Sequence, residues 1–196
     1  MTKDSNRFET VIRLIDEANE ADPNQEKWQD SLHPKEWLYS QRMTAWLKRV
    51  YPNASEELQL AAHAQHICRW AIPRSDYPMD KVGYHKWRRE LQVFHASKAG
   101  ELMEQVGYDA DSILKVQALL QKKNLRKDPV CQQLEDVICL VFLDHYFDAF
   151  AEKHADEKVV DILQKTWRKM TATGQAEALK IKFPVRAESL LQKALS

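Results

Sequence analysis

The sequence predicts an all-α protein, a compact single-domain multi-helix bundle, and three observations support this prediction. Apolar residues recur along most of the chain at the roughly 3.6-residue spacing of amphipathic helices. No segment alternates apolar and polar residues between hairpin turns, as the strands of a half-buried sheet would. The chain has 196 residues, and domains typically hold about 100–200 residues. We therefore expect one all-α domain over residues 1–196.

The first two helices are predicted from their apolar spacing. The first helix has one apolar face, formed by Phe8, Val11, Ile12 and Ile15. A polar segment, EADPNQEKWQDSLHP, follows this helix. The segment leads to a second helix, which we expect from about Lys35 to Val50.

A third helix is predicted to begin after Ser55. The serine hydroxyl can cap the helix, and the two glutamates that follow it face the positive end of the helix dipole. We expect this helix to run to about Ala71 and to stop before Pro73, because the residue before a proline disfavours helical backbone. The segment from 73 to 82 contains two prolines and is expected to form a structured loop.

Two further helices are expected before the centre of the chain. The fourth should run from about Tyr84 to Val106, because Gly107 follows it and glycine is favoured just past a helix end. Either Asp111 or Ser112 can cap the fifth helix, which should end near Lys123.

The last third of the chain is predicted to be helical as well. Asp128 followed by Pro129 is a strong start signal, since aspartate caps helices and proline is tolerated at the first helical position. The helix that follows, CQQLEDVICLVFLDHYFDAFAEK, is apolar almost all round and should be buried. Helices near 156–173 and 175–195 complete the chain, with Gly174 at the end of the first of them.

Composition and charge exclude several classes of function. Equal numbers of basic and acidic residues, 29 of each, argue against a general nucleic-acid or membrane binder, so attraction of an anion must be local.

No apolar run approaches the roughly 20 residues that span a bilayer, and the first residues do not resemble a secretory signal. Three cysteines without C-x-x-C spacing favour a reduced, cytoplasmic protein. The sequence carries no signal for an oligomeric state.

The stretch HAQHICRWAIPRSDYPMDKVGYHKWRREL, from His63 to Leu91, is basic and rich in aromatic residues. Arginine forks can bind phosphate, and Trp or Tyr rings can stack on a base. The stretch therefore predicts a local pocket for a phosphorylated small molecule or a nucleic acid. The alternative is a surface loop held by its rings, with solvated charges. The candidate binding residues are Arg69, Trp70, Arg74, Tyr77, Tyr84, Trp87 and Arg88.

Histidines and buried acids are the candidates for chemistry. His63 and His66 would share one face of the third helix and could bind a metal or orient a phosphate; alternatively, one lies in the core and the other on the surface. His95 is a possible ligand or a satisfied core residue. Glu135 and Asp136 lie in the apolar sixth helix, where a carboxylate is costly to bury unless it is paired or bound to a metal.

An ion pair is the alternative to a catalytic role for these two acids. An arginine such as Arg69 or Arg74 would be the partner. A separate feature is Gly100 within the fourth helix, because glycine there costs about 1 kcal/mol relative to alanine. Its presence indicates a close approach by another helix.

Five sequence phrases carry a family resemblance. They are WLYSQRMTAWL, QHICRWAIPRSDYP, GYHKWRREL, LEDVICLVFLDHYFDAF and KTWRKM. With them the chain resembles the family named domain of unknown function 4202, from about residue 8 to 195. The family name implies no activity.

The order of elements is also similar, more distantly, to the HD-domain superfamily of all-helical metal phosphohydrolases and di-iron oxygenases. Gln65-His66 stands where these proteins carry a His-Asp pair, and His95-Ala96 is similar to a later histidine motif. Asp136 falls where the closing aspartate would. Two positions depart from the pattern, because Tyr39 replaces the first ligand and Gln65 replaces the histidine of the pair.

This second resemblance implies an HD-like fold and a divalent metal. His66, His95 and Asp136 would be the catalytic residues, acting as metal ligands or as acid–base groups. The wider set of candidate metal ligands is His63, His66, His95, Glu135 and Asp136.

Three hypotheses about function follow. The first is an HD-like metal-dependent hydrolase that acts on a phosphorylated substrate, a nucleotide or a nucleic-acid end. The second is a non-catalytic nucleotide- or RNA-binding module with a degenerate HD fold. The third is an iron-dependent oxygenase in the same helical frame, in which His63 supplies a missing ligand.

Overall fold

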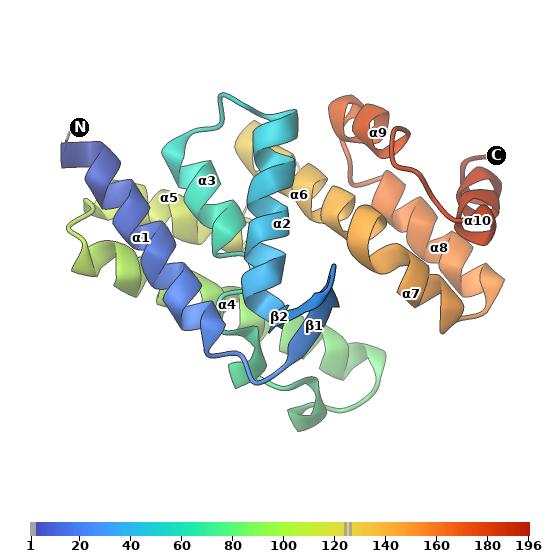
Figure 1. Ribbon diagram of the computed structural model, residues 1–196, viewed down its shortest axis with the longest axis horizontal. Helices are drawn as coiled ribbons and strands as arrows, with labels where there is room; N and C mark the ends of the chain where they lie inside the picture. The colour runs from blue at the N-terminus through green and yellow to red at the C-terminus, as the bar shows by residue number, and fades with distance from the viewer. Residues whose placement is uncertain (1–2, 124, 126) are drawn as a thin grey trace. The chain divides into compact units, whose positions relative to one another are not determined.

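The structure, a computed structural model, describes residues 3–123, 125 and 127–196, with side chains from Asn6 onward. Ten α-helices, α1 to α10, contain most of these residues, and the sheet among them has two strands (Figure 1). The predicted all-α fold class is confirmed. Within the described residues, none of the helices combines the length and the apolar character that crossing a lipid bilayer requires.

The chain divides into two compact units. Unit 1 consists of residues 1–45 and 53–124, and unit 2 consists of residues 46–52 and 125–196. Each unit has fully buried apolar side chains of its own, such as Met43 and Leu58 in unit 1 and Leu134 and Phe147 in unit 2. The expectation of a single domain over the whole chain stays a prediction.

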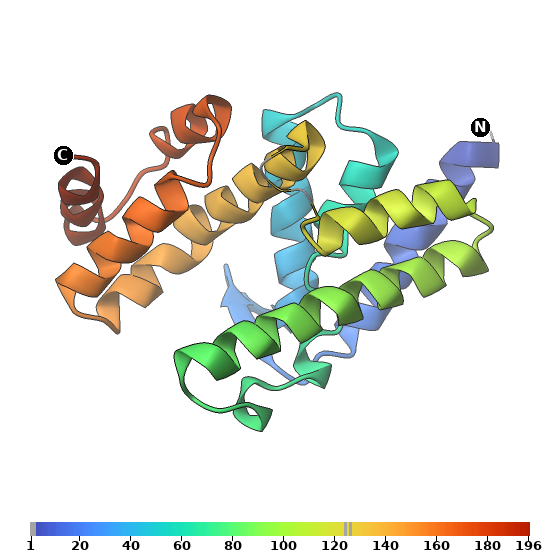
Figure 2. The same ribbon diagram turned by 180° about the vertical axis from the view of Figure 1, so that it is seen from behind.

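The helices of unit 1 follow the predicted order. They are α1 (Lys3–Glu20), the first part of α2 (Lys35–Val50), α3 (Glu56–His63), α4 (Lys81–Gln105) and α5 (Ala110–Leu120). Helices α4 and α5 lie side by side (Figure 2). A Cβ at Gly100 of α4 would lie 2.4 Å from Gln117 Nε2 of α5. The close helix approach predicted at this glycine is therefore confirmed.

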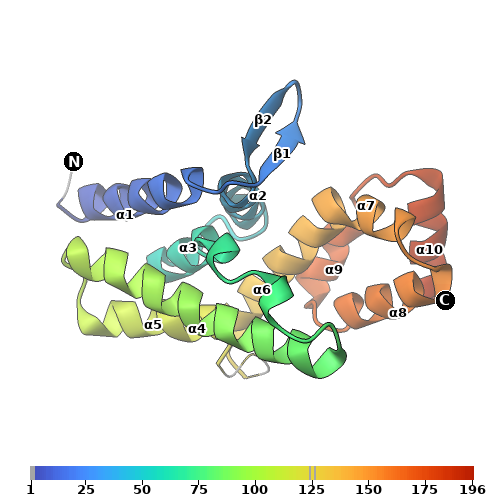
Figure 3. The same ribbon diagram turned by 90° about the horizontal axis from the view of Figure 1, so that it is seen from below.

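A β-hairpin that the sequence analysis missed lies between α1 and α2. Strand β1 (Gln25–Trp28) pairs antiparallel with β2 (Ser31–Pro34), and Figure 3 shows the hairpin standing away from the helices of unit 1. Gln29, in its two-residue turn, has a positive φ of 54°. Most side chains of both strands are exposed, so the segment lacks the apolar alternation that marks a half-buried strand.

The third helix is shorter than predicted. Ser55 caps α3 as expected, through a hydrogen bond from the Leu58 N–H. However, α3 ends at His63, and a turn leads to Cys68, whose φ of 49° is left-handed. Two short 3-10 helices follow, η1 (Arg69–Ala71) and η2 (Arg74–Asp76). The prediction of one helix to Ala71 is wrong because the chain reverses at Cys68 before it reaches the proline.

Helices α4 and α5 begin earlier than predicted because of their caps. Asp80 caps α4 by accepting from the Gly83 N–H, and Asp109, rather than Asp111 or Ser112, caps α5. Gly107 has a φ of 86° just past the end of α4, as predicted.

After residue 128, the described part of unit 2 consists of helices joined by short turns. Its helices are α6 (Pro129–Val141), the π-helical turn η3 (Phe142–Tyr146), α7 (Phe147–Glu152), α8 (Asp156–Trp167), α9 (Ala172–Ala178) and α10 (Val185–Leu195). Asp128 and Pro129 begin α6 as predicted. Gly174 lies inside α9 and does not end a helix, so that prediction is wrong.

Candidate functional site

Three titratable side chains of unit 1 form one cluster. Glu36 comes from the first turn of α2, His66 from the turn after α3, and His95 from the middle of α4. Glu36 Oε2 lies 3.2 Å from His66 Nδ1, and the ring centroids of His66 and His95 are 6.0 Å apart. Glu36 and His95 are only 5% and 3% exposed. The sequence analysis predicted that His66 and His95 would share a site, and the structure places them together.

The turn after α3 and a neighbouring ring orient His66. In this turn, the Ile67 N–H donates a backbone hydrogen bond to the Ala64 carbonyl oxygen. The His66 ring then stacks on the Tyr39 ring, with centroids 3.9 Å apart and planes 15° from parallel. Tyr39, named above as a departure from the HD pattern, therefore covers one face of the histidine.

His95 is held in one tautomer by a backbone carbonyl. Its Nδ1 donates a hydrogen bond of 2.8 Å to the carbonyl oxygen of Ile67, which can only accept. In the neutral ring, Nε2 therefore carries a lone pair. This atom is buried and has no hydrogen-bond partner among the described residues. His66 Nδ1 is also buried, and it lies 3.2 Å from Glu36 Oε2 without the geometry of a hydrogen bond. Buried polar atoms without partners are rare and point to a ligand or a special role.

Burial and local charge keep both imidazoles neutral. Burial lowers the pKa of His66 well below its usual range, and burial together with His66 lowers the pKa of His95 to about 3. Burial raises the pKa of Glu36 against the opposing effect of Arg69. The cations that further lower the pKa of His66 are Arg69, Arg88, Lys122 and Lys35. The cluster thus offers the lone pair of His95 Nε2 close to several positive charges.

Arg69 lies beside the cluster and next to a ring. Its guanidinium carbon is 5.0 Å from the centroid of the Trp87 ring. Trp87 is itself fixed, because its indole N–H donates to the carbonyl oxygen of Ile72. The predicted binding residues Arg69 and Trp87 are therefore in contact distance of one another, and Arg69 also acts electrostatically on His66.

The guanidinium group of Arg74 is hydrogen-bonded to the backbone of its own loop. Its guanidinium donates to the carbonyl oxygens of Tyr77 and Pro78, at 2.9 and 2.7 Å. These bonds hold the loop that precedes α4 in a compact conformation. The loop also packs against the first turn of α4, because a Cβ at Gly83 would collide with the Pro78 carbonyl. The phosphate-binding donors predicted for Arg74 are thus engaged by backbone.

The remaining aromatic candidates differ in exposure. Tyr84 is 41% exposed, and its hydroxyl lies 3.5 Å from Arg88 Nη1. Tyr77 is half-buried and donates its hydroxyl hydrogen to the Glu90 carboxylate. Trp70 is half-buried in η1. Of these rings, Tyr84 offers the most open face for stacking.

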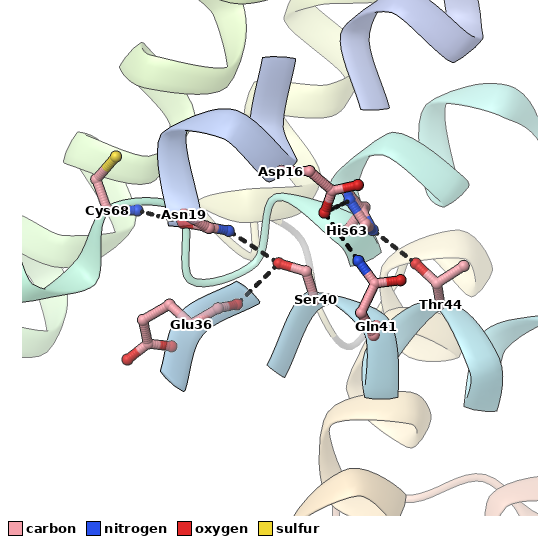
Figure 4. A network of polar contacts seen from close by, with 8 residues as sticks. All are labelled: Asp16, Asn19, Glu36, Ser40, Gln41, Thr44, His63 and Cys68. Atoms are coloured by element: carbon pink, nitrogen blue, oxygen red, sulfur yellow. Dashed lines mark hydrogen bonds and ion pairs between the residues drawn. The ribbon is translucent and has the colours of Figure 1, made fainter. Parts of the chain in front are cut away.

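His63 belongs to a different network from His66 (Figure 4). Its Nε2 lies 3.1 Å from Asp16 Oδ1, and its Nδ1 lies 2.8 Å from Thr44 Oγ1. Gln41 donates to the same Asp16 oxygen. The helix that was expected to place His63 and His66 on one face ends at His63, so the two rings diverge.

Glu135 and Asp136 are paired within unit 2. Asp136 is 0% exposed and accepts hydrogen bonds from the Tyr51 hydroxyl and the Thr171 N–H, at 2.6 and 2.7 Å. Glu135 Oε1 lies 3.6 Å from Lys169 Nζ. Of the two alternatives for these acids, the structure shows the partnered one: Asp136 is hydrogen-bonded and Glu135 is ion-paired, with partners in unit 2 in place of the arginines considered above.

A cleft of about 360 Å³ opens in unit 2 beside these partners. Tyr51 and Thr171, which bind Asp136, form part of its wall. The other lining residues are Lys127, Asp128, Pro129, Gln132, Gln133 and Thr173.

Comparison with family models matches residues 9–191 to one family, described as Domain of unknown function (DUF4202). This chain belongs to the DUF4202 family. No curated protein and no solved structure gives a significant match to it. The resemblance to HD-domain proteins stays a prediction.

For this DUF4202 chain, the sequence analysis missed Glu36 as a member of the cluster. Glu36 lies in the first turn of α2, where an acid is also expected to stabilise the helix dipole. The signal that could have found it is its position three residues before Tyr39, on the same face of the helix. As they stand, no three His, Cys, Asp or Glu side chains of the described residues are grouped closely enough to hold a metal ion.

Proposed function

We propose that this chain is a divalent-metal-dependent hydrolase that acts on a phosphorylated substrate, a nucleotide or a nucleic-acid end. One observation carries the proposal. Two neutral imidazoles lie near the Glu36 carboxyl group and several cations, and His95 Nε2 is buried without a hydrogen-bond partner among the described residues. Imidazole nitrogens and carboxylate oxygens are the usual protein ligands of zinc and related metals.

The chemistry of the cluster fits a metal. Ligands about 2.0–2.2 Å from a shared metal lie about 3 Å from one another, and Glu36 Oε2 and His66 Nδ1 are 3.2 Å apart. The Ile67 carbonyl holds His95 in the tautomer that leaves Nε2 available, which is the usual support for a metal-binding histidine. Glu36, His66 and His95 would hold the metal. In this proposal Glu36 supplies the carboxylate that the HD resemblance assigned to Asp136.

The residues around the cluster would bind the phosphate and the base of the substrate. A bound divalent metal activates water and polarises a phosphoryl oxygen. Arg69 and Arg88 would neutralise the phosphate, since an arginine fork matches phosphate geometry. The exposed ring of Tyr84 would stack on a base. Tyr39 limits access of water to one face of His66.

The compartment and the partner follow from the same reasoning. Three cysteines without paired spacing favour a reducing compartment, the cytoplasm. The partner would be a phosphorylated small molecule or nucleic acid bound through this local basic and aromatic surface.

A non-catalytic binding module is the second candidate. The observation that favours it is the exposed Tyr84 ring beside Arg88 on α4, a combination that binds nucleotides without a metal. In that case the rings and arginines would bind a nucleotide or RNA, and the histidine cluster would have a structural role.

Metal analysis and activity measurements test the proposal together. We expect protein purified without chelator to contain about one divalent metal per chain, and His66→Ala and Glu36→Gln to lose it. His154→Ala, at a histidine of unit 2, is the matched control and should keep the metal. Hydrolysis of nucleoside phosphates should disappear with the metal.

Each other outcome has a defined meaning. Nucleotide binding without metal or hydrolysis would favour the binding module. Iron in place of zinc, manganese or magnesium would favour the iron-dependent oxygenase of the third hypothesis. Metal retained by both cluster variants would refute the assignment of the ligands.

A further inference from the structure

We infer that Asn19 is a positioning residue for the Glu36–His66–His95 cluster, an inference that rests on the function proposed above. Its side-chain amide ties together the two backbone segments that carry Glu36 and His66. The hydrogen bonds of Asn19 go to Ser40 and Cys68, and it would act on the rings through the segments that it holds.

The amide of Asn19 is fully buried and uses both of its ends (Figure 4). Asn19 lies at the end of α1 and is 0% exposed. Its Nδ2 donates to Ser40 Oγ at 2.9 Å, and its Oδ1 accepts from the backbone N–H of Cys68 at 2.9 Å. One planar group thus connects α2 with the turn after α3.

On the α2 side, the connection reaches the residue that bears the carboxyl group of the cluster. The Ser40 hydroxyl donates to the backbone carbonyl of Glu36 at 3.0 Å. This leaves the Ser40 oxygen to accept from Asn19, so the three groups form a continuous chain of hydrogen bonds. These two hydrogen bonds hold the backbone of the first turn of α2, which carries the Glu36 side chain.

On the other side, the connection reaches both histidines. The Cys68 N–H that binds Asn19 follows directly on Ile67, whose carbonyl oxygen accepts from His95 Nδ1 at 2.8 Å. His66 precedes Ile67 in the same turn. The segment from His66 to Cys68 is therefore clamped between Asn19 of α1 and His95 of α4.

The backbone of this turn is strained, which is why an external tie is needed. Cys68 has a φ of 49°, in the left-handed region that residues with a Cβ rarely adopt. Such a conformation persists only where the surrounding structure determines it. The bond from Cys68 N–H to Asn19 is made to a side chain because α3 has already ended.

Asparagine suits this position because it supplies a donor and an acceptor on one rigid group. Leucine has a similar shape and neither function. If Asn19 were only a packing residue, its loss would lower stability in the same way as the loss of any buried group. If it positions the cluster, its loss should also change the tautomer of His95 and the metal affinity.

The test compares Asn19→Leu with Val11→Ala, a core substitution on the same helix. Nitrogen NMR of labelled histidine, assigned with His95→Gln, reports the tautomer of His95 in the metal-free protein at neutral pH. Titration with Zn²⁺ reports affinity. We expect Asn19→Leu to mix the His95 tautomers and to weaken Zn²⁺ binding about 10- to 100-fold, the usual effect of removing a group that orients a ligand. Val11→Ala should change neither.

The two readouts separate the possible failures. If the wild-type protein takes up no Zn²⁺, the proposed function fails. The His95 tautomer in Asn19→Leu, compared with Val11→Ala, then still decides the role of Asn19. If Asn19→Leu matches Val11→Ala in tautomer and affinity, the positioning role is overturned while the proposed function stands. Asn19→Ser, whose hydroxyl is too short to span both partners, decides the same question if Asn19→Leu does not fold.

Discussion

Gly174 lies against the buried carboxylate of Asp136, and this contact leaves no room for a side chain. A Cβ at Gly174 would lie 2.7 Å from Asp136 Cγ and Oδ1. The carboxylate is held in place because it accepts hydrogen bonds from Tyr51 and Thr171. We expect Gly174→Ala to lower the free energy of unfolding by about 1–3 kcal/mol, the usual cost of overpacking. Chemical denaturation measures this change.

Gly100 in α4 supplies the matched control for the same substitution. A Cβ there would also be too close, at 2.4 Å, but to Nε2 at the far end of the flexible Gln117 side chain. The amide can swing away, and alanine is favoured over glycine within a helix by about 1 kcal/mol. We expect Gly100→Ala to leave stability unchanged or to raise it. Equal losses in the two variants would contradict the role given to the Asp136 carboxylate.

Tyr51 should make stability depend on pH in the alkaline range. Burial and the hydrogen bond to Asp136 raise the pKa of Tyr51 to about 12, whereas an unfolded tyrosine titrates at about 10. The folded state therefore favours the neutral phenol. The resulting stabilisation is complete below about pH 10 and is lost as the pH rises toward about 12. We expect Tyr51→Phe to flatten this decline in the free energy of unfolding, measured by urea denaturation at several pH values.

A second measurement checks the same assignment. Burial and the hydrogen bond to Glu56 also raise the pKa of Tyr108, so the absorbance of tyrosinate should show late-titrating phenols in addition to Tyr51, and Tyr51→Phe should lack one of them. Tyr84→Phe, at an exposed tyrosine, controls for the removal of one phenol. The assignment is wrong if Tyr51→Phe retains the full alkaline loss of stability.

Single residues show where reasoning from sequence succeeds and where it stops. The free-energy cost of burying a carboxylate indicated that Glu135 and Asp136 would be either paired or bound to a metal, and the structure shows partners for both. The identity of the partners could not be predicted, because Tyr51 is distant in sequence and comes close only in the folded chain. Glu36 was missed for a related reason. An acid in a first helical turn has a sufficient local explanation, so its spacing from Tyr39 did not single it out.

Among the elements, the β1–β2 hairpin depends on a strained turn. Gln29 has a φ of 54°, and a residue with a Cβ pays about 1–2 kcal/mol in the left-handed region. Glycine adopts this backbone without the steric cost. We expect Gln29→Gly to strengthen the hairpin and to slow amide hydrogen exchange of the β1 and β2 residues.

The control places glycine at an exposed position within a strand of the same hairpin. Lys27 in β1 is paired with Leu32 and has extended backbone, where glycine weakens a strand. Lys27→Gly should therefore speed hydrogen exchange of the same amides. If both substitutions change exchange in the same direction, the strain at Gln29 does not limit the hairpin.

Elements with local signals were predicted well, and elements set by tertiary contacts were not. The second helix was predicted from Lys35 to Val50, which are its bounds, and the start of α6 followed from Asp128 and Pro129. The end of α3 at His63 was not predictable in this way, because the turn that follows depends on Asn19 of another helix. The π-helical turn η3 likewise interrupts a continuous apolar run that has no local break signal.

For the whole molecule, the all-α class could be predicted because helical periodicity is repeated along most of the chain. The site could be predicted only in part. The order of motifs brought His66 and His95 together, and composition indicated Arg69 and Trp87 as neighbours. The complete cluster requires α2, the turn after α3 and α4 to meet within unit 1, which depends on contacts far apart in the sequence.

The charge of the molecule as a whole decides how a phosphorylated ligand would be attracted. The formal net charge is zero, so attraction must come from the few cations near His66. Salt screens such local charge beyond about 10 Å at 0.1 M ionic strength. We expect nucleotides to raise the melting temperature at low salt and to do so much less at high salt. Thermal denaturation with a panel of phosphorylated compounds measures this shift.

Arg69 should carry most of this effect, because the donors of Arg74 are used by its own loop. We expect Arg69→Ala to remove the shift in melting temperature, and Arg69→Lys to reduce it, since a point charge does not reproduce the arginine fork. Arg168→Ala, at an exposed arginine of unit 2, is the matched control and should keep the full shift. If an unphosphorylated apolar ligand stabilises the protein at low salt and the phosphorylated panel does not, the ligand class assigned to this surface is wrong.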